Sequence, residues 1–270
     1  MSNVNLRSVL IGAVKWASIV TDLPFGRRKG PRILIYHQVG AGSGLEMDLK
    51  VEAFGAQLDW MMTNGEIVDL ETGLGLVGAP GSEAKYVLTF DDGHESLFQH
   101  AFPLMLERRT PFTLYVTTAP LQSDLLLHGD SRMRLVSWHA IQRMRDSGLM
   151  TVGAHGHQHY DARAHPRATL EEDLVRCNTL LFENLGVEPR HFAYPWGHPS
   201  EAVESVIRHL YHSAVIGSGP GLDEMTDLYR IPRIPVMLSD ALPFLFARKM
   251  WGGFRLEASL RSLRDRLARQ

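Results

Sequence analysis

Short apolar runs alternate with segments of helical periodicity along most of this chain. The runs are rich in β-branched and aromatic residues, which favour buried strands. They cover residues 33–39, 67–70, 85–90, 112–118, 150–155, 191–195 and 213–217. The segments between them repeat apolar residues every three or four positions and predict helices over residues 54–64, 95–109, 137–146, 169–185 and 200–211. This alternation indicates a parallel sheet or a (β/α) barrel.

Local signals mark where several of these elements begin and end. Ser137 is expected to cap one helix and Thr169 another, because both precede helical patterns. Residues 73–82 are rich in glycine and predict a loop, and residues 121–134 predict a loop or short helices. Two prolines restrict residues 230–236 to an edge strand or an irregular strand.

The overall composition is that of a folded globular protein. The chain has 270 residues, 44% hydrophobic and 21% charged, and an α/β barrel of this length commonly forms one domain. A net charge of −2 argues against nucleic acid as a partner. The single cysteine, Cys177, excludes an intrachain disulfide and lies in a helical pattern, so we expect it to pack in the core.

The two ends of the chain differ from its middle. Residues 8–20 are apolar but contain Lys15, and they are shorter than the ~20 residues of a membrane span. They also make a poor signal peptide. We divide the chain into an amphipathic and basic extension (residues 1–30), a main domain (31–245) and a basic amphipathic helix (246–270). Such ends can dock on the domain or on an anionic membrane surface. Because no convincing signal peptide or membrane span is evident, we expect a cytoplasmic or membrane-peripheral location.

Two adjacent carboxylates, Asp91 and Asp92, follow the predicted strand over residues 85–90. Burial of an unpaired charge there costs on the order of several kcal/mol, so a cation, hydrogen bonds or a catalytic role must compensate for it. A plain turn at Asp92-Gly93, with Asp91 capping the next helix, is the competing interpretation. The strand and its two acids alone do not separate these interpretations.

Three histidines lie at the end of the predicted strand over residues 150–155 or just after it. His155 and His159 would share one face of a helical turn, but in an extended chain His157 would share that face too. Two imidazoles and one carboxylate leave an open position on the ion, which is typical of catalytic zinc. Such an ion lowers the pKa of a bound water from ~16 toward ~7, and a second carboxylate can then take the proton.

Together with a third motif at residues 192–197, the aspartates and histidines resemble those of the polysaccharide deacetylase family, the carbohydrate esterases built on the NodB homology domain. Residues 89–93, TFDDG, resemble the first motif, which implies that Asp91 is the catalytic base and Asp92 a metal ligand. The resemblance extends from about Pro31 to Val236. It implies a single distorted (β/α) barrel with fewer strands than a full eight.

The second motif of the family is matched by HGHQH at residues 155–159. Its two outer histidines bind the ion in the family, which implies His155 and His159 as ligands and Zn²⁺ as the expected metal. Gly156 stands where the family usually has serine or threonine. The resemblance therefore predicts that one supporting hydrogen bond is absent.

The third motif is matched by FAYPWG at residues 192–197, which forms one wall of the substrate groove in the family. It implies that the backbone N–H of Trp196 helps to hold the oxyanion. Side-chain contacts with the substrate are expected from Tyr194, Pro195, Trp196, His37 and Trp138.

Two family residues lack an obvious counterpart here. Many members carry an arginine that orients the catalytic acid where this chain has Ala193. Arg230 or Arg233 is expected to replace it, with Arg233 preferred. The family's late histidine, the general acid, has no match after Pro235, so the candidate proton donors are His157, His128 and His37.

The reaction that the resemblance implies is metal-dependent removal of an acetyl group from an N-acetylated sugar. The substrate would be a polysaccharide, an oligosaccharide or a lipid-linked glycan. O-deacetylation and hydrolysis of another amide are alternatives within the same fold. A non-catalytic glycan-binding barrel is a further interpretation, which Ala193 and the missing late histidine favour.

Overall fold

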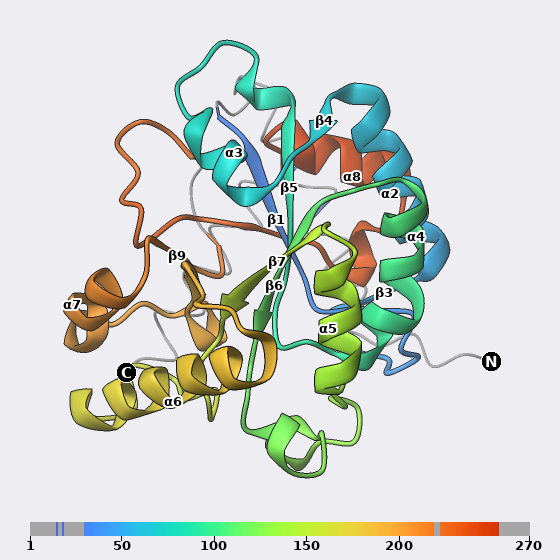
Figure 1. Cartoon of the computed structure of the whole chain (residues 1–270). Coiled ribbons are helices and arrows are strands. Elements are labelled where there is room, and N and C mark those ends of the chain that lie inside the picture. Colours follow the sequence, from blue (N-terminus) through green and yellow to red (C-terminus); the bar gives the residue numbers. More distant parts are fainter. Residues whose placement is uncertain (1–14, 16–17, 19–29, 219–221, 254–270) are drawn as a thin grey trace.

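A ring of parallel strands lies at the centre of the molecule (Figure 1). The computed structural model describes residues 30–218 and 222–253, together with Lys15 and Ser18. The strands are hydrogen-bonded in the order β10-β1-β5-β6-β7-β8-β9, and each is parallel to its neighbours. Their bounds are β1 Arg32–Tyr36, β5 Lys85–Phe90, β6 Phe112–Val116, β7 Met150–Ala154, β8 His191–Ala193, β9 Ser213–Val215 and β10 Ile234–Pro235.

The segment that leads into β10 closes the ring. Ile231 bridges to Val215 of β9, and Ile234 pairs with Leu34 of β1. Three short strands lie outside the ring: β4 beside the start of β5, and β2 paired with β3. Their bounds are β2 Gln38–Val39, β3 Asp48–Leu49 and β4 Glu66–Ile67. The described residues thus form a distorted barrel, which confirms the expected fold.

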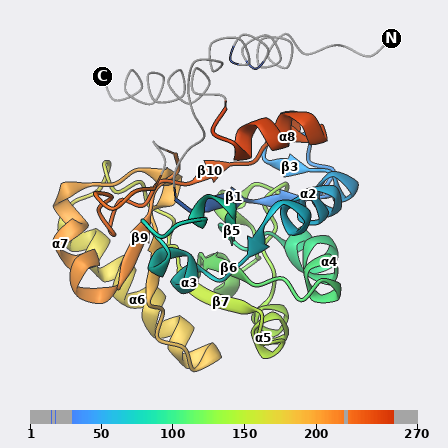
Figure 2. The ribbon, with the colours of Figure 1, turned by 90° about the horizontal axis from the view of Figure 1, so that it is seen from above.

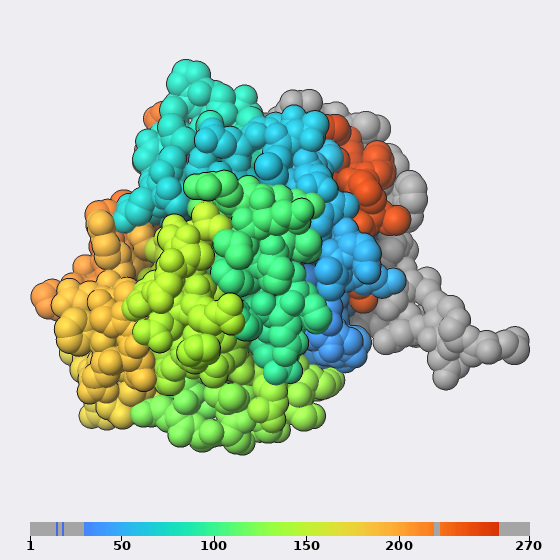
Figure 3. All heavy atoms as spheres, turned by 45° about the vertical axis from the view of Figure 1, so that its right-hand side comes forward, coloured from blue at the N-terminus to red at the C-terminus, as the bar shows by residue number. Residues whose placement is uncertain are grey.

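Helices cover the outside of this barrel (Figure 2). In Figure 3, α2, α4, α5 and α6 lie side by side across one face, coloured from blue through green to yellow. The helices are α2 Val51–Asn64, α3 Leu70–Gly75, α4 Phe102–Glu107, α5 Trp138–Asp146, α6 Arg167–Leu185, α7 Glu201–Leu210 and α8 Pro243–Met250. Shorter 3₁₀ or π turns are η1 Ser82–Ala84, η2 Leu97–Ala101, η3 Pro120–Gln122, η4 Leu127–Gly129, η5 Pro195–Gly197 and η6 Leu238–Asp240.

Alternate side chains along each strand enter two different cores, because the side-chain period of a strand is two. Ile33 of β1 and Val87 of β5 pack inside the barrel. Leu34 and Leu88, their neighbours in sequence, pack beneath the outer helices. The apolar runs that predict strands are therefore continuous, since both faces of every long strand are buried.

Helix α3 takes the place of the end of the strand predicted over residues 67–70 and of the start of the loop predicted over residues 73–82. The chain leaves β4 at Ile67, and Asp69 caps α3 by accepting a hydrogen bond from the backbone N–H of Thr72 at 2.9 Å. A Cβ on Gly73 would lie 2.5 Å from Val87 Cγ2. This glycine permits close packing of the helix on β5, so tertiary contact overrides its low helix propensity.

Two other helices begin differently from expectation. Residues 95–109 form the π turn η2 followed by α4, rather than one helix. Pro103 lies in the first turn of α4 and has no N–H to continue an α-helical ladder from η2. Ser137 caps α5 as predicted, but Thr169 does not cap α6, because the extended backbone at Pro166 starts that helix at Arg167.

Cys177 is fully buried in the outer core, as its helical context predicts. Burial raises the pKa of its thiol to about 12, so the reactive thiolate is almost absent at neutral pH. We expect native protein at pH 8 to react with a thiol reagent only over hours and denatured protein to react within minutes. Stoichiometric modification of the folded protein within minutes would contradict this packing.

The structure describes a few contacts made by residues near the two ends of the chain. Asp240 is fully buried and accepts hydrogen bonds from Lys15 and, at 2.6 Å, from Lys249. Helix α8 crosses the expected boundary at residue 245 and packs Phe246 into the core. Most of the extension over residues 1–30, and residues 254–270 of the helix predicted over 246–270, lie outside the described residues, so membrane contact stays a prediction. Within the described residues, no helix has the length and apolarity needed to span a membrane.

Candidate metal centre

The motifs predicted from the sequence meet at the carboxyl ends of the barrel strands. Asp91 and Asp92 follow β5, and His155 follows β7. Arg233 directly precedes β10. Because parallel strands end on the same face of a barrel, the aspartates and His155 converge there. The long side chain of Arg233 reaches Asp91 from the start of β10.

Asp92, His155 and His159 form a compact buried cluster. Asp92 Oδ1 lies 3.5 Å from His155 Nε2 and 3.3 Å from His159 Nε2. The three candidate ligand atoms all lie within 4.8 Å of one another. Asp92 Oδ1 is buried and has no hydrogen-bond partner among the described residues. An orphaned carboxylate oxygen that faces two imidazole nitrogens fits a divalent cation, so these residues could hold an ion of the expected kind.

The far side of the His155 ring fixes the tautomer that metal binding requires. His155 Nδ1 lies 2.8 Å from the carbonyl oxygen of Ala193. A carbonyl can only accept, so Nδ1 carries the proton and Nε2 directs its lone pair toward Asp92. Ala193, which lacks the arginine side chain expected there, thus contributes through its backbone.

Asp91 lies beside the cluster and is held by Arg233. The guanidinium donates to both carboxylate oxygens, with Nη1–Oδ1 2.6 Å and Nη2–Oδ2 2.7 Å. Arg233 is 1% exposed and also donates to Thr89 Oγ1 and to the carbonyl oxygen of Ile216. Arg230, the other candidate, pairs with Glu204 instead. Of the two arginines, Arg233 reaches the predicted base.

Charge and burial oppose each other at these side chains. Burial alone would raise the pKa of Asp91, but Arg233 and His155 outweigh it, and the pKa is lowered. The pKa of Asp92 is also lowered, because His155 and His159 outweigh burial. Burial lowers the pKa of His159 to about 4, whereas the two aspartates raise that of His155 against its burial. Two ionised carboxylates and a neutral His159 therefore face each other at neutral pH.

Strained backbone concentrates at this face of the barrel. Four of the non-glycine residues with positive φ surround the cluster: Asp92 (67°), His128 (51°), His159 (56°) and Trp196 (63°). Such conformations cost about 1–3 kcal/mol each and persist where surrounding contacts enforce them. The rings of His128, His159 and Trp196 contact one another at this face.

Gly156 is a departure that the structure explains. Its φ is +77°, and a Cβ there would lie 2.8 Å from Asp173 Oδ2. Asp173, on α6, accepts hydrogen bonds from the backbone N–H groups of His157 and Gln158, each at 2.7 Å. Asp173 thus holds the histidine loop from another element. In the sequence it is hidden among three acids near the start of a helix.

The remaining predicted residues fall into different surroundings. His37 follows β1, is half-buried, and its charge contributes to lowering the pKa of both Asp91 and Asp92. His157 Nδ1 instead lies 2.9 Å from Thr118 Oγ1, and His157 is not a member of the metal-ligand cluster.

Only part of the expected groove wall is open to solvent. Trp196 is 56% exposed, and its ring lies 5.3 Å from that of His159. Tyr194 and Pro195 are buried, and Trp138 packs against the outer core. In this conformation the Tyr194 side chain packs against Phe192 in the core and cannot contact a substrate directly.

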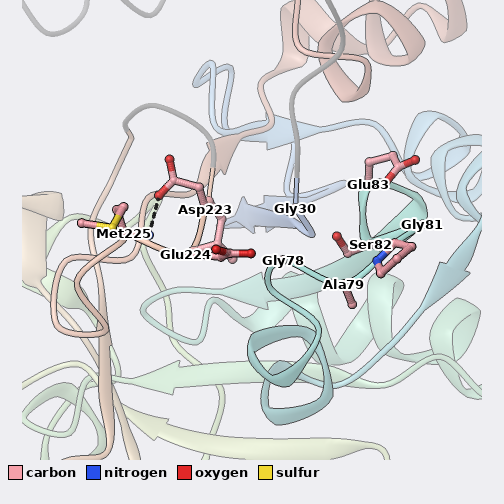
Figure 4. Close-up of a pocket in the computed structure, with 11 residues that line it drawn as sticks. Gly30, Gly78, Ala79, Gly81, Ser82, Glu83, Asp223, Glu224 and Met225 are labelled. Carbon is pink, nitrogen blue, oxygen red and sulfur yellow. Dashed lines mark hydrogen bonds between the residues drawn. The ribbon is translucent and has the colours of Figure 1, made fainter.

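A separate pocket of about 720 Å³ lies at the opposite, amino end of the strands (Figure 4). It is lined by Gly30, by residues 78–83 before β5 and by residues 222–225. Glu83, Asp223 and Glu224 place carboxylates around it, without a buried cationic partner among its lining residues. Its position separates it from the metal cluster, and we assign it no function.

With its barrel and carboxylate–histidine cluster, the chain belongs to the polysaccharide deacetylase family. The model of that family matches residues 78–215. The chain is 21% identical over 240 residues to the poly-beta-1,6-N-acetyl-D-glucosamine N-deacetylase of Escherichia coli K12. It is 24% identical over 180 residues to the enzyme of the same name from Staphylococcus aureus MRSA252.

The chain is shorter than both relatives. The matches cover 73% and 62% of this chain but 34% and 58% of the E. coli and S. aureus proteins. Among solved structures, IcaB from Ammonifex degensii superposes with a TM-score of 0.67 and 25% identity. That match covers 83% of this chain and 97% of IcaB.

Proposed function

We propose that this protein is a metal-dependent hydrolase that removes acetyl groups from N-acetylglucosamine residues of a glycan. The observation that carries the proposal is the buried Asp92, His155 and His159 cluster, with an unpartnered Asp92 oxygen, beside the Asp91–Arg233 pair. Two relatives are named for N-deacetylation of poly-beta-1,6-N-acetyl-D-glucosamine, which suggests that polymer as the first substrate to test.

Asp92 Oδ1, His155 Nε2 and His159 Nε2 would hold the ion. One carboxylate with two imidazoles favours Zn²⁺ and leaves positions open. An ion bound there would make water more acidic and stabilise negative charge on the acetyl oxygen. The backbone N–H of Trp196 is our candidate for an additional donor to that oxygen.

Asp91 is the proposed general base. Its pKa is lowered, so it is ionised at neutral pH and can take a proton from the attacking water. Each carboxylate oxygen has two lone pairs, and Arg233 uses one on each oxygen, which leaves acceptor capacity toward the cluster. Asp91 Oδ2 lies 3.8 Å from His155 Nε2, close enough to serve a water at the cluster.

His37 is the proposed proton donor to the leaving amine. It interacts electrostatically with both Asp91 and Asp92, and it is half-buried at the carboxyl end of β1. His157 contacts Thr118, and His128 contacts His159, so both alternatives already have partners. Breakage of the C–N bond would release acetate and the free amine, with one proton supplied through His37.

The proposal predicts acetate release that depends on a divalent ion. Protein loaded with Zn²⁺ should release acetate from poly-β-1,6-N-acetylglucosamine, and treatment with a chelator should reduce the rate to background. Re-addition of Zn²⁺ should restore it. Acetylated xylan in a parallel assay separates O-deacetylation from N-deacetylation. A metal-loaded sample inactive on both substrates would favour a non-catalytic glycan-binding barrel.

A further inference from the structure

We propose that His128 is a positioning residue for His159, an inference that rests on the proposed metal site. His128 belongs to η4, in the loop between β6 and α5. Its Nε2 lies 3.1 Å from His159 Nδ1, and the two ring centroids are 5.3 Å apart at an interplanar angle of 62°. The second nitrogen of His159, Nε2, faces Asp92.

The direction of this hydrogen bond follows from the cluster. To bind an ion through Nε2, the neutral ring of His159 must carry its proton on Nδ1. Nδ1 then donates, and His128 Nε2 accepts. His128 therefore does for His159 what the carbonyl oxygen of Ala193 does for His155. Both candidate imidazole ligands would be fixed in tautomer and orientation by an acceptor behind them.

His128 is itself held in place by its ring contact with Trp196 and by the anchored backbone of Leu127. Its ring stacks on Trp196 with centroids 5.8 Å apart and an interplanar angle of 24°. Trp196 Nε1 in turn donates to the backbone carbonyl oxygen of His159 at 3.3 Å. The preceding residue, Leu127, is buried and donates its backbone N–H to the carbonyl oxygen of Met133. Three separate loops thus meet in a closed set of contacts around His159.

His128 is exposed as a whole residue, so its truncation removes no side chain from the core. A substitution should therefore test the hydrogen bond and not the fold. Glutamine places a carbonyl oxygen near the position of imidazole Nε2 and can accept the same hydrogen bond, whereas alanine cannot. His139, an exposed histidine on α5, provides a matched control.

The test compares Zn²⁺ affinity, measured by competition with a chromophoric chelator, in the unchanged protein and three variants. His128→Ala should weaken binding by about 10- to 100-fold, the usual effect of losing a partner behind a metal ligand. His128→Gln should recover most of that loss, and His139→Ala should bind as the unchanged protein does. Acetate release at saturating Zn²⁺ provides a second readout.

Several outcomes would overturn this role. Unchanged affinity in His128→Ala would show that His159 needs no acceptor, while the proposed function would stand. Equal loss in His128→Ala and His128→Gln would show that hydrogen-bond acceptance is not the cause. Absence of Zn²⁺ binding by the unchanged protein would reject the metal site and this inference together.

Discussion

Asp91→Asn is expected to reduce acetate release by about 10²- to 10⁴-fold, the usual contribution of a general base, while Zn²⁺ affinity stays near that of the unchanged protein. The amide has the shape of the carboxylate but cannot take a proton from water. Asp92, His155 and His159, which form the candidate ligand set, are untouched by the change. Metal affinity and turnover should therefore separate in this variant.

The same substitution should also lower stability, because it leaves the buried Arg233 charge without its carboxylate. Removal of one partner from a buried ion pair costs about 3–5 kcal/mol, and the amide oxygen should retain part of that through hydrogen bonding. Thermal unfolding of the variant must therefore be measured, and turnover assayed well below its midpoint. Asp146→Asn, in an exposed pair with Arg145, is the matched control. Full activity in folded Asp91→Asn protein would remove Asp91 from the mechanism.

The sequence predicted the cluster because its members are close together in the chain or follow strands that the apolar pattern reveals. Asp91 and Asp92 directly follow β5, and the histidine motif directly follows β7. Parallel topology then brings both motifs to one face without further information. This local information was enough to predict the barrel fold and the approximate position of the candidate site.

Contacts across long stretches of chain could not be predicted in the same way. Arg233 lies 142 positions from Asp91, and nothing local distinguishes it from Arg230. The difference arises because Arg233 is carried inside the barrel just before β10, whereas Arg230 remains at the surface with Glu204. The position of each arginine relative to the start of β10 therefore determines which carboxylate it pairs with.

The sequence did not reveal the supporting roles of two residues, Asp173 and His128, although it named His128 as a candidate proton donor. Asp173 follows two glutamates near the start of the helix predicted from residue 169, where the helix dipole is a sufficient explanation for acidic residues. His128 lies in a segment without periodicity, in a left-handed conformation that sequence does not reveal. Both act on the histidine motif from separate elements, so only the folded structure shows their role.

His155→Ala and His159→Ala should each abolish stoichiometric Zn²⁺ binding, whereas His157→Ala should retain it. His155 and His159 direct Nε2 toward the same Asp92 oxygen, at 3.5 and 3.3 Å. His157, between them in sequence, lies against Thr118. His155→Ala and His159→Ala would each lose one of the three proposed protein ligands, so the effect should exceed the 10- to 100-fold change expected of a supporting residue.

This prediction is checked by measuring metal content after dialysis with inductively coupled plasma mass spectrometry. His157→Ala is the matched control from within the same motif. His155→Ala also leaves the Ala193 carbonyl without its partner, so circular dichroism must show that the variant is folded. Unchanged metal content in folded His155→Ala or His159→Ala protein would refute the ligand assignment. Loss of the metal in His157→Ala would instead mean that all three histidines face the ion, as an extended chain would place them.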